Sequence, residues 1–300
     1  MSAMRFGFAG LGQMGGPMAA NIVAAGFDLS VFDKAGTAER APDGAKPLES
    51  LDALAAVVDT LFLSLPDGPV TLAVARDLAA LQDRAVSVVI DLSTIGLEAA
   101  KEAGQILADA GIQYIDAPVS GGQSGAIAGT ITVMWGGPAE VLEIHRDVIT
   151  AIAKNLFHVG DQAGHGQTVK LLNNFLSGTA MAATSEAVAF GLSQGIEMKS
   201  LLDVVNVSTG RNTATSDKFP NRVLTGSYDA GFKTKLLTKD VGLFLDNAKA
   251  AGTPTAVAET VVDLWRRCDA ALPDSDFTRI YEFLTKKNRI SNLLPTAEKR

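Results

Sequence analysis

The sequence is poor in residues that form covalent cross-links or bind metals. Of its 300 residues one is cysteine, Cys268, and three are histidines, His145, His158 and His165. A single cysteine excludes a disulfide within the chain and metal sites built from several cysteines, and the histidines lack zinc-ligand spacing on one helix. We therefore expect no metal site, and we expect each histidine at the surface or in a loop.

Positive charge and long apolar runs are also scarce. Lysine and arginine number 26 against 33 aspartates and glutamates, which gives a formal net charge of −7. Nucleic acids and anionic membranes attract clustered positive charge, so we expect neither as a partner. No stretch reaches the roughly 18 to 20 apolar residues of a membrane helix. Glycines and Gln13 interrupt the apolar N-terminus, and no small-residue cleavage site follows it, so we expect a cytoplasmic protein.

The hydrophobic residues predict helices packed on a sheet. Aromatic residues make up only 6% of the chain, and alanine, valine and leucine carry most of the 47% that is hydrophobic. Short apolar runs alternate with alanine-rich helical stretches in the first half, which predicts a mostly parallel sheet covered on both faces. We expect the strands at 4–9, 29–32, 60–64, 87–91, 113–116 and 130–135.

Beyond residue 160 strand patterns stop and helical ones continue. A helix is expected at 13–25 in the first half, and the later helices are expected at 167–194, 199–207, 238–251 and 255–270. The change predicts an α/β domain, residues 1–163, followed by an all-helical domain, residues 164–300. The boundary is expected in the glycine-rich segment Gly160–Gly166.

Five glycines lie within the apolar stretch FAGLGQMGGPMAANIVAAGFDLSVFD, residues 8–33. Gly10, Gly12 and Gly15 form G-x-G-x-x-G between an expected strand and an expected helix. In a dinucleotide site the first glycine permits the tight turn, the second lets a pyrophosphate approach, and the third lets helix and strand pack closely. The alternative is a glycine-rich turn without a ligand, but the strand–turn–helix context favours a cofactor held by Gly10, Leu11, Gly12, Gln13, Met14 and Gly15.

Asp33, at the end of the second expected strand, bears on the choice of cofactor. An acidic side chain there can accept hydrogen bonds from both ribose hydroxyls, and it would repel a 2′-phosphate. NAD is therefore the expected cofactor. NADP remains the alternative cofactor, because Lys34 or Arg40 could reach a 2′-phosphate.

Polar residues follow several of the expected strands. In DAPVSGG, residues 116–122, Ser120 offers a hydroxyl and Gly121 and Gly122 offer backbone N–H groups that suit a carboxylate, although an ordinary turn has the same composition. The segments SLPD (64–67) and DLST (91–94) stand at strand ends, where open α/β sheets bind ligands, and could flank a nicotinamide.

Two lysines stand out in the helical half. Lys170, in GHGQTVKLLNN (164–174), lies on an otherwise apolar helix with Asn174 one turn later on the same face. A lysine whose stem extends along the surface is the commoner arrangement, and it remains the alternative here. Lys239, in KLLTKDVG (235–242), precedes an apolar helix together with Asp240, and by itself this pair resembles ordinary helix-start charges.

In their order and spacing these segments resemble the β-hydroxyacid dehydrogenases, a family that includes 3-hydroxyisobutyrate dehydrogenases and tartronate semialdehyde reductases. The resemblance runs from GLGQMGGPMAANI through DAPVSGG and GHGQTVKLLNN to LLTKDVG, and VSTGRNTATSDKFP (207–220) resembles the hydroxyisobutyrate branch. It implies a Rossmann-type dinucleotide-binding domain followed by an all-helical domain. It also implies a homodimer or homotetramer with contacts through the helical domain.

The resemblance assigns roles to individual residues. The family's catalytic lysine falls on Lys170. The family's substrate-binding positions fall on Ser120, Gly121, Gly122 and Asn174, and the positions beside the cofactor fall on Leu65, Pro66, Thr94 and Lys239. Oxidation of an alcohol by hydride transfer also requires a base for the hydroxyl proton, and a lysine can be that base if burial lowers its pKa towards neutrality.

The implied reaction is oxidation of a small 3-hydroxy acid without decarboxylation. The related 6-phosphogluconate dehydrogenases have a glutamate three residues after the asparagine, where this chain has Ser177, and the chain is too short for their enlarged helical domain. An imine reductase on the same scaffold and a dinucleotide-binding protein without turnover are the alternatives, but such relatives lose the lysine. Hydroxyisobutyrate, glycerate, serine, hydroxybutyrate and threonate all fit a carboxylate clamp beside a hydroxyl.

Overall fold

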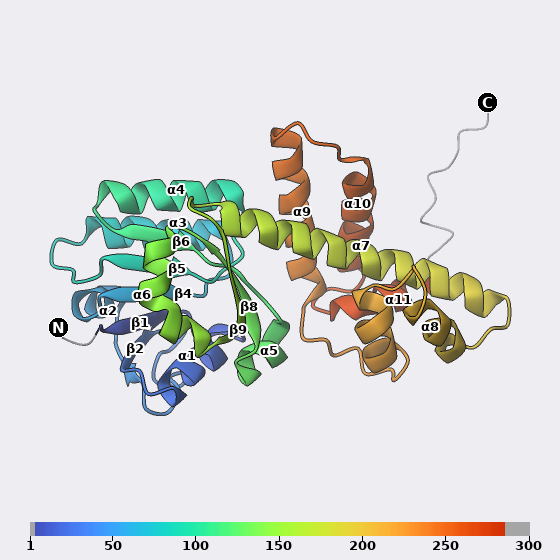
Figure 1. Ribbon diagram of the computed structural model, residues 1–300, viewed down its shortest axis with the longest axis horizontal. Helices are drawn as coiled ribbons and strands as arrows, with labels where there is room; N and C mark the ends of the chain where they lie inside the picture. The colour runs from blue at the N-terminus through green and yellow to red at the C-terminus, as the bar shows by residue number, and fades with distance from the viewer. Residues whose placement is uncertain (1–3, 286–300) are drawn as a thin grey trace. The chain divides into compact units, whose positions relative to one another are not determined.

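The computed structural model describes residues 4–285. The chain divides into two compact units, Met1–Leu171 and Leu172–Arg300, and the dividing point lies within the long helix α7 (His165–Ser193). The first unit combines a sheet with helices, whereas the described part of the second is helical (Figure 1). The α/β-then-helical fold class predicted from the sequence is confirmed, and the domain bounds 1–163 and 164–300 stay a prediction.

The first unit is built on one mixed sheet. Its elements before α7 are β1 (Phe6–Ala9), α1 (Gly15–Ala24), β2 (Leu29–Phe32), β3 (Lys46–Pro47), α2 (Leu51–Val57), β4 (Thr60–Leu63), α3 (Gly68–Ala80), β5 (Val88–Asp91), α4 (Leu97–Asp109), β6 (Gln113–Asp116), β7 (Val119–Ser120), α5 (Gly122–Ala128), β8 (Ile131–Gly136), α6 (Ala139–Thr150) and β9 (Ala153–Gly160). The strand order is β3-β2-β1-β4-β5-β6-β8-β7, with β9 paired to β8. Strands β1 to β6 are parallel, and β8 is antiparallel to β6 and β7.

The six predicted strands are all present, as β1, β2, β4, β5, β6 and β8. Three further strands were not predicted: β3 and β7, which have two residues each, and β9. Much of β9 is exposed, and it pairs with β8 alone, so it lacks the continuous apolar run of a strand buried on both faces.

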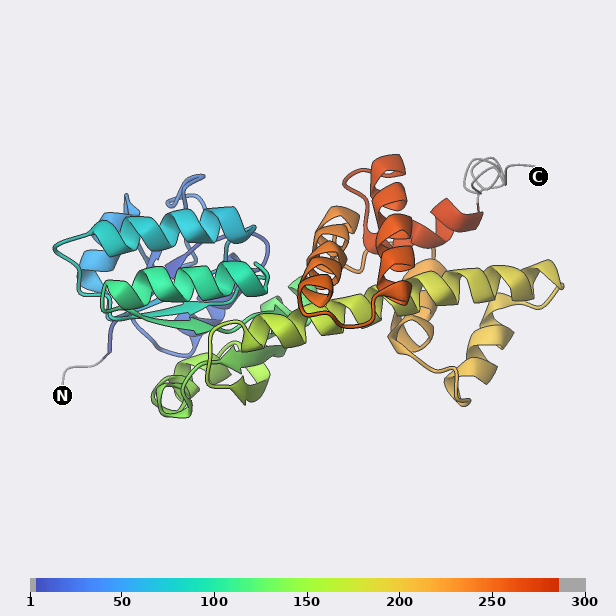
Figure 2. The same ribbon diagram turned by 90° about the horizontal axis from the view of Figure 1, so that it is seen from above.

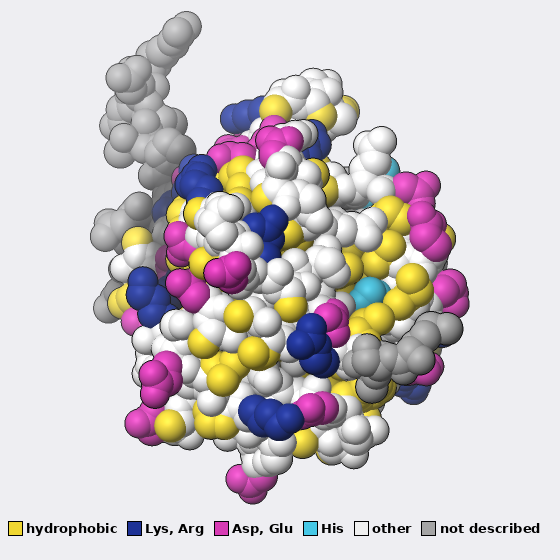
Figure 3. Space-filling model, turned by 90° about the vertical axis from the view of Figure 1, so that its left-hand side faces the viewer, with side chains coloured by type: hydrophobic (Ala, Val, Ile, Leu, Met, Phe, Trp, Pro, Cys, Tyr) yellow, Lys and Arg dark blue, Asp and Glu magenta, His cyan; other side chains and the backbone are white. Residues whose placement is uncertain are grey.

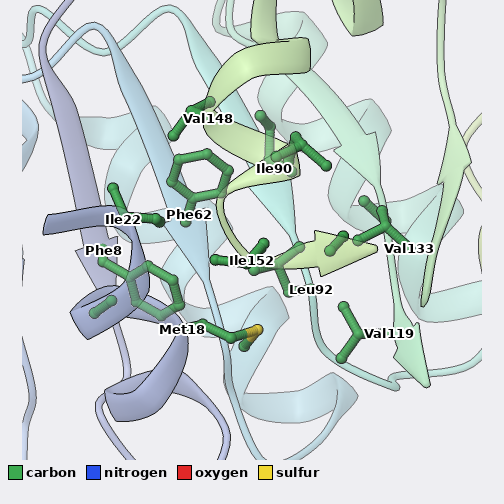
Figure 4. Close-up of a cluster of buried hydrophobic side chains, with 14 of the residues drawn as sticks. Phe8, Met18, Ile22, Phe62, Ile90, Leu92, Val119, Val133, Val148 and Ile152 are labelled. Atoms are coloured by element: carbon green, nitrogen blue, oxygen red, sulfur yellow. The ribbon is translucent and has the colours of Figure 1, made fainter. Parts of the chain in front are cut away.

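Helices cover both faces of this sheet (Figures 1 and 2). Phe8 and Phe62 point to the face that packs against α1 and α6, and Figure 4 shows them with Met18 and Ile22 of α1. Their neighbours along the strands, such as Leu61, point to the opposite face and pack against α2, α3 and α4, because side chains alternate along a strand. The chain order reverses at β1, which lies between β2 and β4, and open α/β sheets bind ligands beyond the strand ends at such a point.

The second unit packs helices around one apolar cluster. After α7 it contains α8 (Met198–Asn206), a π-helix (Ala214–Val223), α9 (Thr234–Ala250), α10 (Ala256–Ala271), a short 3-10 helix (Phe277–Arg279) and α11 (Ile280–Thr285). Trp265 of α10 is fully buried, and its indole N–H donates to the carbonyl of Gly178 on α7 at 3.3 Å. A Cβ atom on Gly178 would lie 3.2 Å from that indole nitrogen, a tight contact that the glycine avoids.

Helices α7, α8 and α10 confirm three predicted helices, but the predicted start of α9 is wrong. The helix begins at Thr234, whose backbone N–H donates to the carbonyl of Ser275 at 2.8 Å, and not at residue 238. Lys239 and Asp240 therefore lie in the second turn of α9. The π-helix was not predicted. It contains Pro220, which has no N–H to donate and cannot lie within a regular α-helix without disrupting it.

The charged residues do not gather by sign on the face shown in Figure 3, where Lys and Arg side chains alternate with Asp and Glu side chains. Surface ion pairs include Arg5–Asp59 and Lys46–Asp28, each at 2.7 Å.

Candidate cofactor and substrate site

The glycine turn after β1 has the geometry of a close backbone approach. Gly10 has φ +94°, and a Cβ atom there would lie 2.3 Å from the carbonyl oxygen of Ser64. A Cβ atom on Gly15 would lie 1.9 Å from the carbonyl oxygen of Gly10, so both positions require glycine. Gly12 differs, since it is exposed and nothing lies within 4 Å of its Cβ position. The space beside Gly12 and the start of α1, which no side chain caps at Met14, fit a phosphate group.

Asp33, just beyond β2, is bonded directly to this turn. Its Oδ2 accepts the backbone N–H of Leu11 at 2.7 Å, and its Oδ1 accepts that of Ala35 at 2.8 Å. The side chain is 10% exposed, and Arg40 Nη1 lies 3.8 Å from Oδ2. Each carboxylate oxygen can accept more than one hydrogen bond, so these contacts still leave acceptor capacity towards a ribose. The structure thus brings together the turn, Asp33 and Arg40, whereas Lys34 is exposed.

The loops after β4 and β5 are also joined. Ser93 Oγ accepts the backbone N–H of Leu65 at 2.7 Å, and the backbone N–H of Ser93 donates to Asp91 Oδ1 at 2.9 Å. Thr94 follows Ser93 and is half-buried, and Pro66 follows Leu65 and is exposed. The three residues predicted beside the nicotinamide therefore lie on two loops that share a hydrogen bond.

Asp116, at the end of β6, binds the start of α7. It is fully buried, and its carboxylate accepts the backbone N–H groups of Gly164 at 3.0 Å, Gly166 at 3.1 Å and Gln167 at 2.8 Å. Burial raises the pKa of this carboxyl to about 7; the three backbone donors act in the opposite direction, and the nearby charge of Asp91 raises the pKa further. Neither Asp116 nor Gln167 was predicted to belong to the site, because nothing in the sequence reveals which buried partners they bind.

The segment DAPVSGG forms a strand-to-helix turn. Val119 and Ser120 make the short strand β7, Ser120 pairs with Thr132 of β8, and α5 begins at Gly122. Gly121 and Gly122 have φ of +136° and +64°, which other residues rarely adopt. Ser120 and Gly122 are half-buried and Gly121 is exposed, so this turn presents a hydroxyl beside an open backbone.

Lys170 lies in the first part of α7 and is only 8% exposed. This burial argues against the alternative of a lysine whose stem extends along the surface. Asn174 is four residues later on the same helix and is 5% exposed. Its Nδ2 donates to Asp240 Oδ2 at 2.6 Å, and Lys239 Nζ lies 3.3 Å from Asp240 Oδ1. Asp240 thus joins two of the predicted site residues, a role that its place in KLLTKDVG did not reveal.

The prediction for the histidines is wrong at His145. This residue is 2% exposed on α6, its Nδ1 lies 2.7 Å from the carbonyl of Val141, and its Nε2 lies 2.9 Å from Thr60 Oγ1. Both ring nitrogens have partners, so the imidazole fits the core, and burial lowers its pKa. Within residues 4–285 no group of three or more potential ligands lies together for a metal ion. No helix in that range is both long and apolar enough to span a membrane.

Two family models cover nearly all of the described chain. Residues 5–160 match the model described as the NAD binding domain of 6-phosphogluconate dehydrogenase. Residues 164–284 match the model described as NAD-binding of NADP-dependent 3-hydroxyisobutyrate dehydrogenase. The change from one model to the other coincides with the change from strands to helices.

Similar proteins match over almost their whole length. A 3-hydroxyisobutyrate dehydrogenase of Pseudomonas aeruginosa is 37% identical, with 94% of this chain and 98% of the relative aligned. A 2-(hydroxymethyl)glutarate dehydrogenase of Eubacterium barkeri is 33% identical over 94% of this chain and 96% of the relative. The solved structure of a Mycobacterium tuberculosis 3-hydroxyisobutyrate dehydrogenase with L-serine has a TM-score of 0.87 at 31% identity, covering 94% of this chain and 99% of that one.

Imine reductases are more distant. That of Streptomyces aurantiacus has a TM-score of 0.62 at 21% identity, a likeness of fold alone. Three observations indicate the same family: the glycine turn, the buried lysine and the whole-length matches. The chain belongs to the β-hydroxyacid dehydrogenase family, and its first unit is a Rossmann-type NAD(P)-binding domain.

Proposed function

We propose that this protein transfers a hydride between NAD(P) and the alcohol carbon of a small 3-hydroxy carboxylic acid, without decarboxylation. The observation that carries the proposal is the buried Lys170 on α7, whose first turn is hydrogen-bonded to the end of β6 in the NAD(P)-binding unit. The relatives named for 3-hydroxyisobutyrate and 2-(hydroxymethyl)glutarate support the substrate class, because both compounds have an alcohol on the carbon next to the α-carbon of a carboxylate. L-serine, named for another Pseudomonas aeruginosa relative, shares this arrangement.

The cofactor would be held by the turn from Gly10 to Gly15 and by Asp33. When bound, the oxidised nicotinamide supplies the hydride acceptor. The open backbone at Gly12 would face the pyrophosphate, and the Asp33 carboxylate would accept the ribose hydroxyls. Leu65, Pro66 and Thr94 would border the nicotinamide side. The position of Asp33 favours NAD over NADP, because its negative charge repels a 2′-phosphate.

Lys170 would be the general base in oxidation and the general acid in reduction. In oxidation its neutral amine accepts the hydroxyl proton as the hydride leaves the alcohol carbon, and in reduction the ammonium returns that proton. Ser120 and the backbone of Gly121 and Gly122 would hold the substrate carboxylate and so fix the alcohol carbon for transfer. Asn174 would support the substrate, and Lys239 would face the cofactor.

Two alternatives fit the chain less well. Decarboxylation after oxidation leaves an enol that an acid must then protonate, and Ser177, the third residue after Asn174 on α7, cannot be that acid. Reduction of an imine requires no carboxylate clamp and no lysine base. The buried Lys170 favours the alcohol substrate, in agreement with the more distant likeness to imine reductases.

We also infer that the protein forms a homodimer or homotetramer through α7. Leu172, Leu176 and Phe190 of this helix are 48%, 56% and 69% exposed. Their spacing places them along one stripe of the helix, with Ala183 and Ala187 exposed between them. A stripe of this kind on a long helix suits packing against the same stripe of a second copy.

Steady-state oxidation assays test the proposal directly. The protein is incubated with NAD or NADP and a panel of 3-hydroxyisobutyrate, glycerate, serine, 3-hydroxybutyrate, threonate and 2-(hydroxymethyl)glutarate, and the absorbance of the reduced nicotinamide is followed. We expect turnover of at least one acid and none of 6-phosphogluconate. Reduction of a cyclic imine without oxidation of any acid would instead support the imine reductase, and cofactor binding without turnover would support a non-catalytic protein.

A further inference from the structure

Gln167 uses both ends of its amide to bind the backbone of one loop. The side chain is fully buried, its Oε1 accepts the N–H groups of Ile95 at 2.9 Å and Gly96 at 3.1 Å, and its Nε2 donates to the carbonyl of Ser93 at 3.0 Å. These three residues enclose Thr94 in the loop between β5 and α4. The side chain therefore fixes the backbone on either side of Thr94.

The amide is the side chain that this loop requires. Ile95 and Gly96 are buried, so their N–H groups would lose their hydrogen bonds without an acceptor at this place, and buried backbone groups are costly to leave unpaired. A glutamate at 167 would offer the acceptor but, when ionised, no donor for the carbonyl of Ser93. A methionine would fill a similar space but would offer neither the acceptor nor the donor.

The main chain of Gln167 is fixed as firmly as its side chain. Its N–H donates to Asp116 Oδ2 at 2.8 Å, which joins it to the end of β6. The loop that its side chain binds is joined in turn to the loop after β4, because Ser93 Oγ accepts the N–H of Leu65 at 2.7 Å. One residue of α7 is thus connected to the ends of β4, β5 and β6.

Lys170 lies three residues after Gln167, almost one turn further along α7. We propose that Gln167 is a positioning residue, which sets the start of α7, and hence Lys170, relative to the loops that carry Thr94 and Leu65. The inference rests on the proposed function, since those residues matter together only if a proton leaves towards Lys170 while a hydride is transferred beside the two loops. Gln167 itself touches neither reacting group.

Two substitutions separate positioning from a merely structural role. Gln167→Met removes all three side-chain bonds at nearly constant size, and Gln167→Glu keeps the acceptor but loses the donor. The matched control is Thr168→Val, which removes the hydrogen bond that Thr168 Oγ1 donates to the carbonyl of Gly164 at 2.8 Å, a bond that does not reach the loop. The substrate is the best acid of the panel above, unlabelled or deuterated at the alcohol carbon.

We expect Gln167→Met to lower kcat roughly 10- to 100-fold, because small misplacements of reacting groups have large effects on rate. The deuterium isotope effect on kcat should rise as hydride transfer becomes slower, while KM and the dissociation constant for NAD change little. Gln167→Glu should lie between Gln167→Met and the wild type, and Thr168→Val should resemble the wild type. A loss of folded protein alone would lower kcat without changing the isotope effect, and that outcome would overturn the inference.

Hydrogen exchange separates failure of this inference from failure of the proposed function. In the wild type the amides of Ile95 and Gly96 should be protected, and in Gln167→Met a peptide covering residues 92–97 should exchange faster, with or without a substrate. A wild-type protein that oxidises no acid of the panel would overturn the proposed function. Hydrogen exchange would then still test whether Gln167 holds the loop around Thr94. Equal exchange in wild type and Gln167→Met would overturn the inference whatever the activity.

Discussion

Asp116 Oδ2 accepts the backbone N–H of Gln167 at 2.8 Å, and this bond joins the end of a buried strand to the first turn of α7. Two further N–H groups, of Gly164 and Gly166, donate to the same carboxylate. A negative charge at a helix start is favourable, because it faces the positive end of the helix dipole. Burial nevertheless dominates here and raises the pKa of Asp116 to about 7.

The first prediction concerns the pH dependence of stability. Because the pKa of about 7 in the folded protein lies above the ordinary value of 3.8 for an aspartate, the unfolded chain releases this proton at a lower pH than the folded chain. The contribution of Asp116 is therefore fully present below the unfolded pKa and is lost as the pH rises through 7. Asp116→Asn cannot titrate, so the free energy of unfolding of the wild type should fall relative to that of the variant, by on the order of 4 kcal/mol across this range.

Urea unfolding of both proteins at several pH values between about 4 and 8 measures this difference. Taking the difference removes the contribution of other groups, including His145, whose lowered pKa acts in the opposite sense by favouring folding at higher pH. A difference that stays constant over the range would show that Asp116 ionises as an ordinary aspartate.

Much of the fold and part of the site follow from local sequence patterns. Six of the strands were predictable because they are short, mostly buried apolar runs between turns. Gly10 and Gly15 were predictable because they belong to a G-x-G-x-x-G pattern between an expected strand and an expected helix. The start of α9 was not predictable, because the hydrogen bond from the Thr234 N–H to the Ser275 carbonyl depends on a segment far along the chain. The edge strand β9 was not predicted, because much of it is exposed and it lacks an apolar run.

Residues that act through buried partners are the ones the sequence does not reveal. Gln167 and Asp240 have ordinary neighbours in the sequence, and their importance depends on hydrogen bonds to Ser93–Gly96 and to Asn174, which only the folded chain shows. His145 illustrates the same point. Its burial depends on Thr60 of strand β4, whose hydroxyl is the hydrogen-bond partner of the second ring nitrogen.

The second prediction concerns cofactor choice. Asp33→Asn removes the negative charge that opposes a 2′-phosphate and keeps an acceptor for the N–H of Leu11, so the ratio of kcat/KM with NAD to that with NADP should fall roughly tenfold or more. Arg40→Ala is the companion variant, since this exposed side chain lies near the same carboxylate. The opposite result would be a wild-type enzyme that prefers NADP and loses this preference in Arg40→Ala. That result would show that Arg40 binds the 2′-phosphate.

The third prediction concerns the carboxylate clamp. Ser120→Ala removes one donor to the substrate carboxylate, so KM should rise about tenfold while the dissociation constant for NAD stays near that of the wild type. Ser124→Ala is a matched control, because Ser124 is an exposed serine on the neighbouring helix α5. Equal losses of substrate and cofactor affinity in Ser120→Ala would indicate a general structural defect.

The fourth prediction concerns assembly. Leu176→Asp and Phe190→Asp place charges in the exposed stripe of α7, so each should shift the protein from an oligomer towards a monomer in light scattering after size-exclusion chromatography. Val257→Asp, at an exposed position on α10 outside the stripe, is the control. An unchanged mass for the α7 variants, with Val257→Asp dissociating instead, would place the interface elsewhere.

The last prediction concerns Lys170. If it transfers the proton, Lys170→Ala should lose on the order of a hundredfold or more in kcat, the usual effect of removing a positioned acid or base. Because Lys170 is only 8% exposed, the variant also leaves a space in α7, so its unfolding should be measured beside its turnover. Lys199→Ala is the control, because that lysine is exposed and paired with Asp203.

Lys170→Arg makes the decisive comparison, because it keeps the positive charge but not the ability to release a proton near neutral pH. We expect it to be nearly as inactive as Lys170→Ala while binding the substrate carboxylate normally. In the wild type the oxidation rate should rise with pH as the ammonium loses its proton, and this rise should be absent from the residual activity of Lys170→Arg. Near-normal turnover of Lys170→Arg would instead make Lys170 a fixed charge beside the carboxylate, and the hydroxyl proton would have to leave through another group or a chain of water molecules.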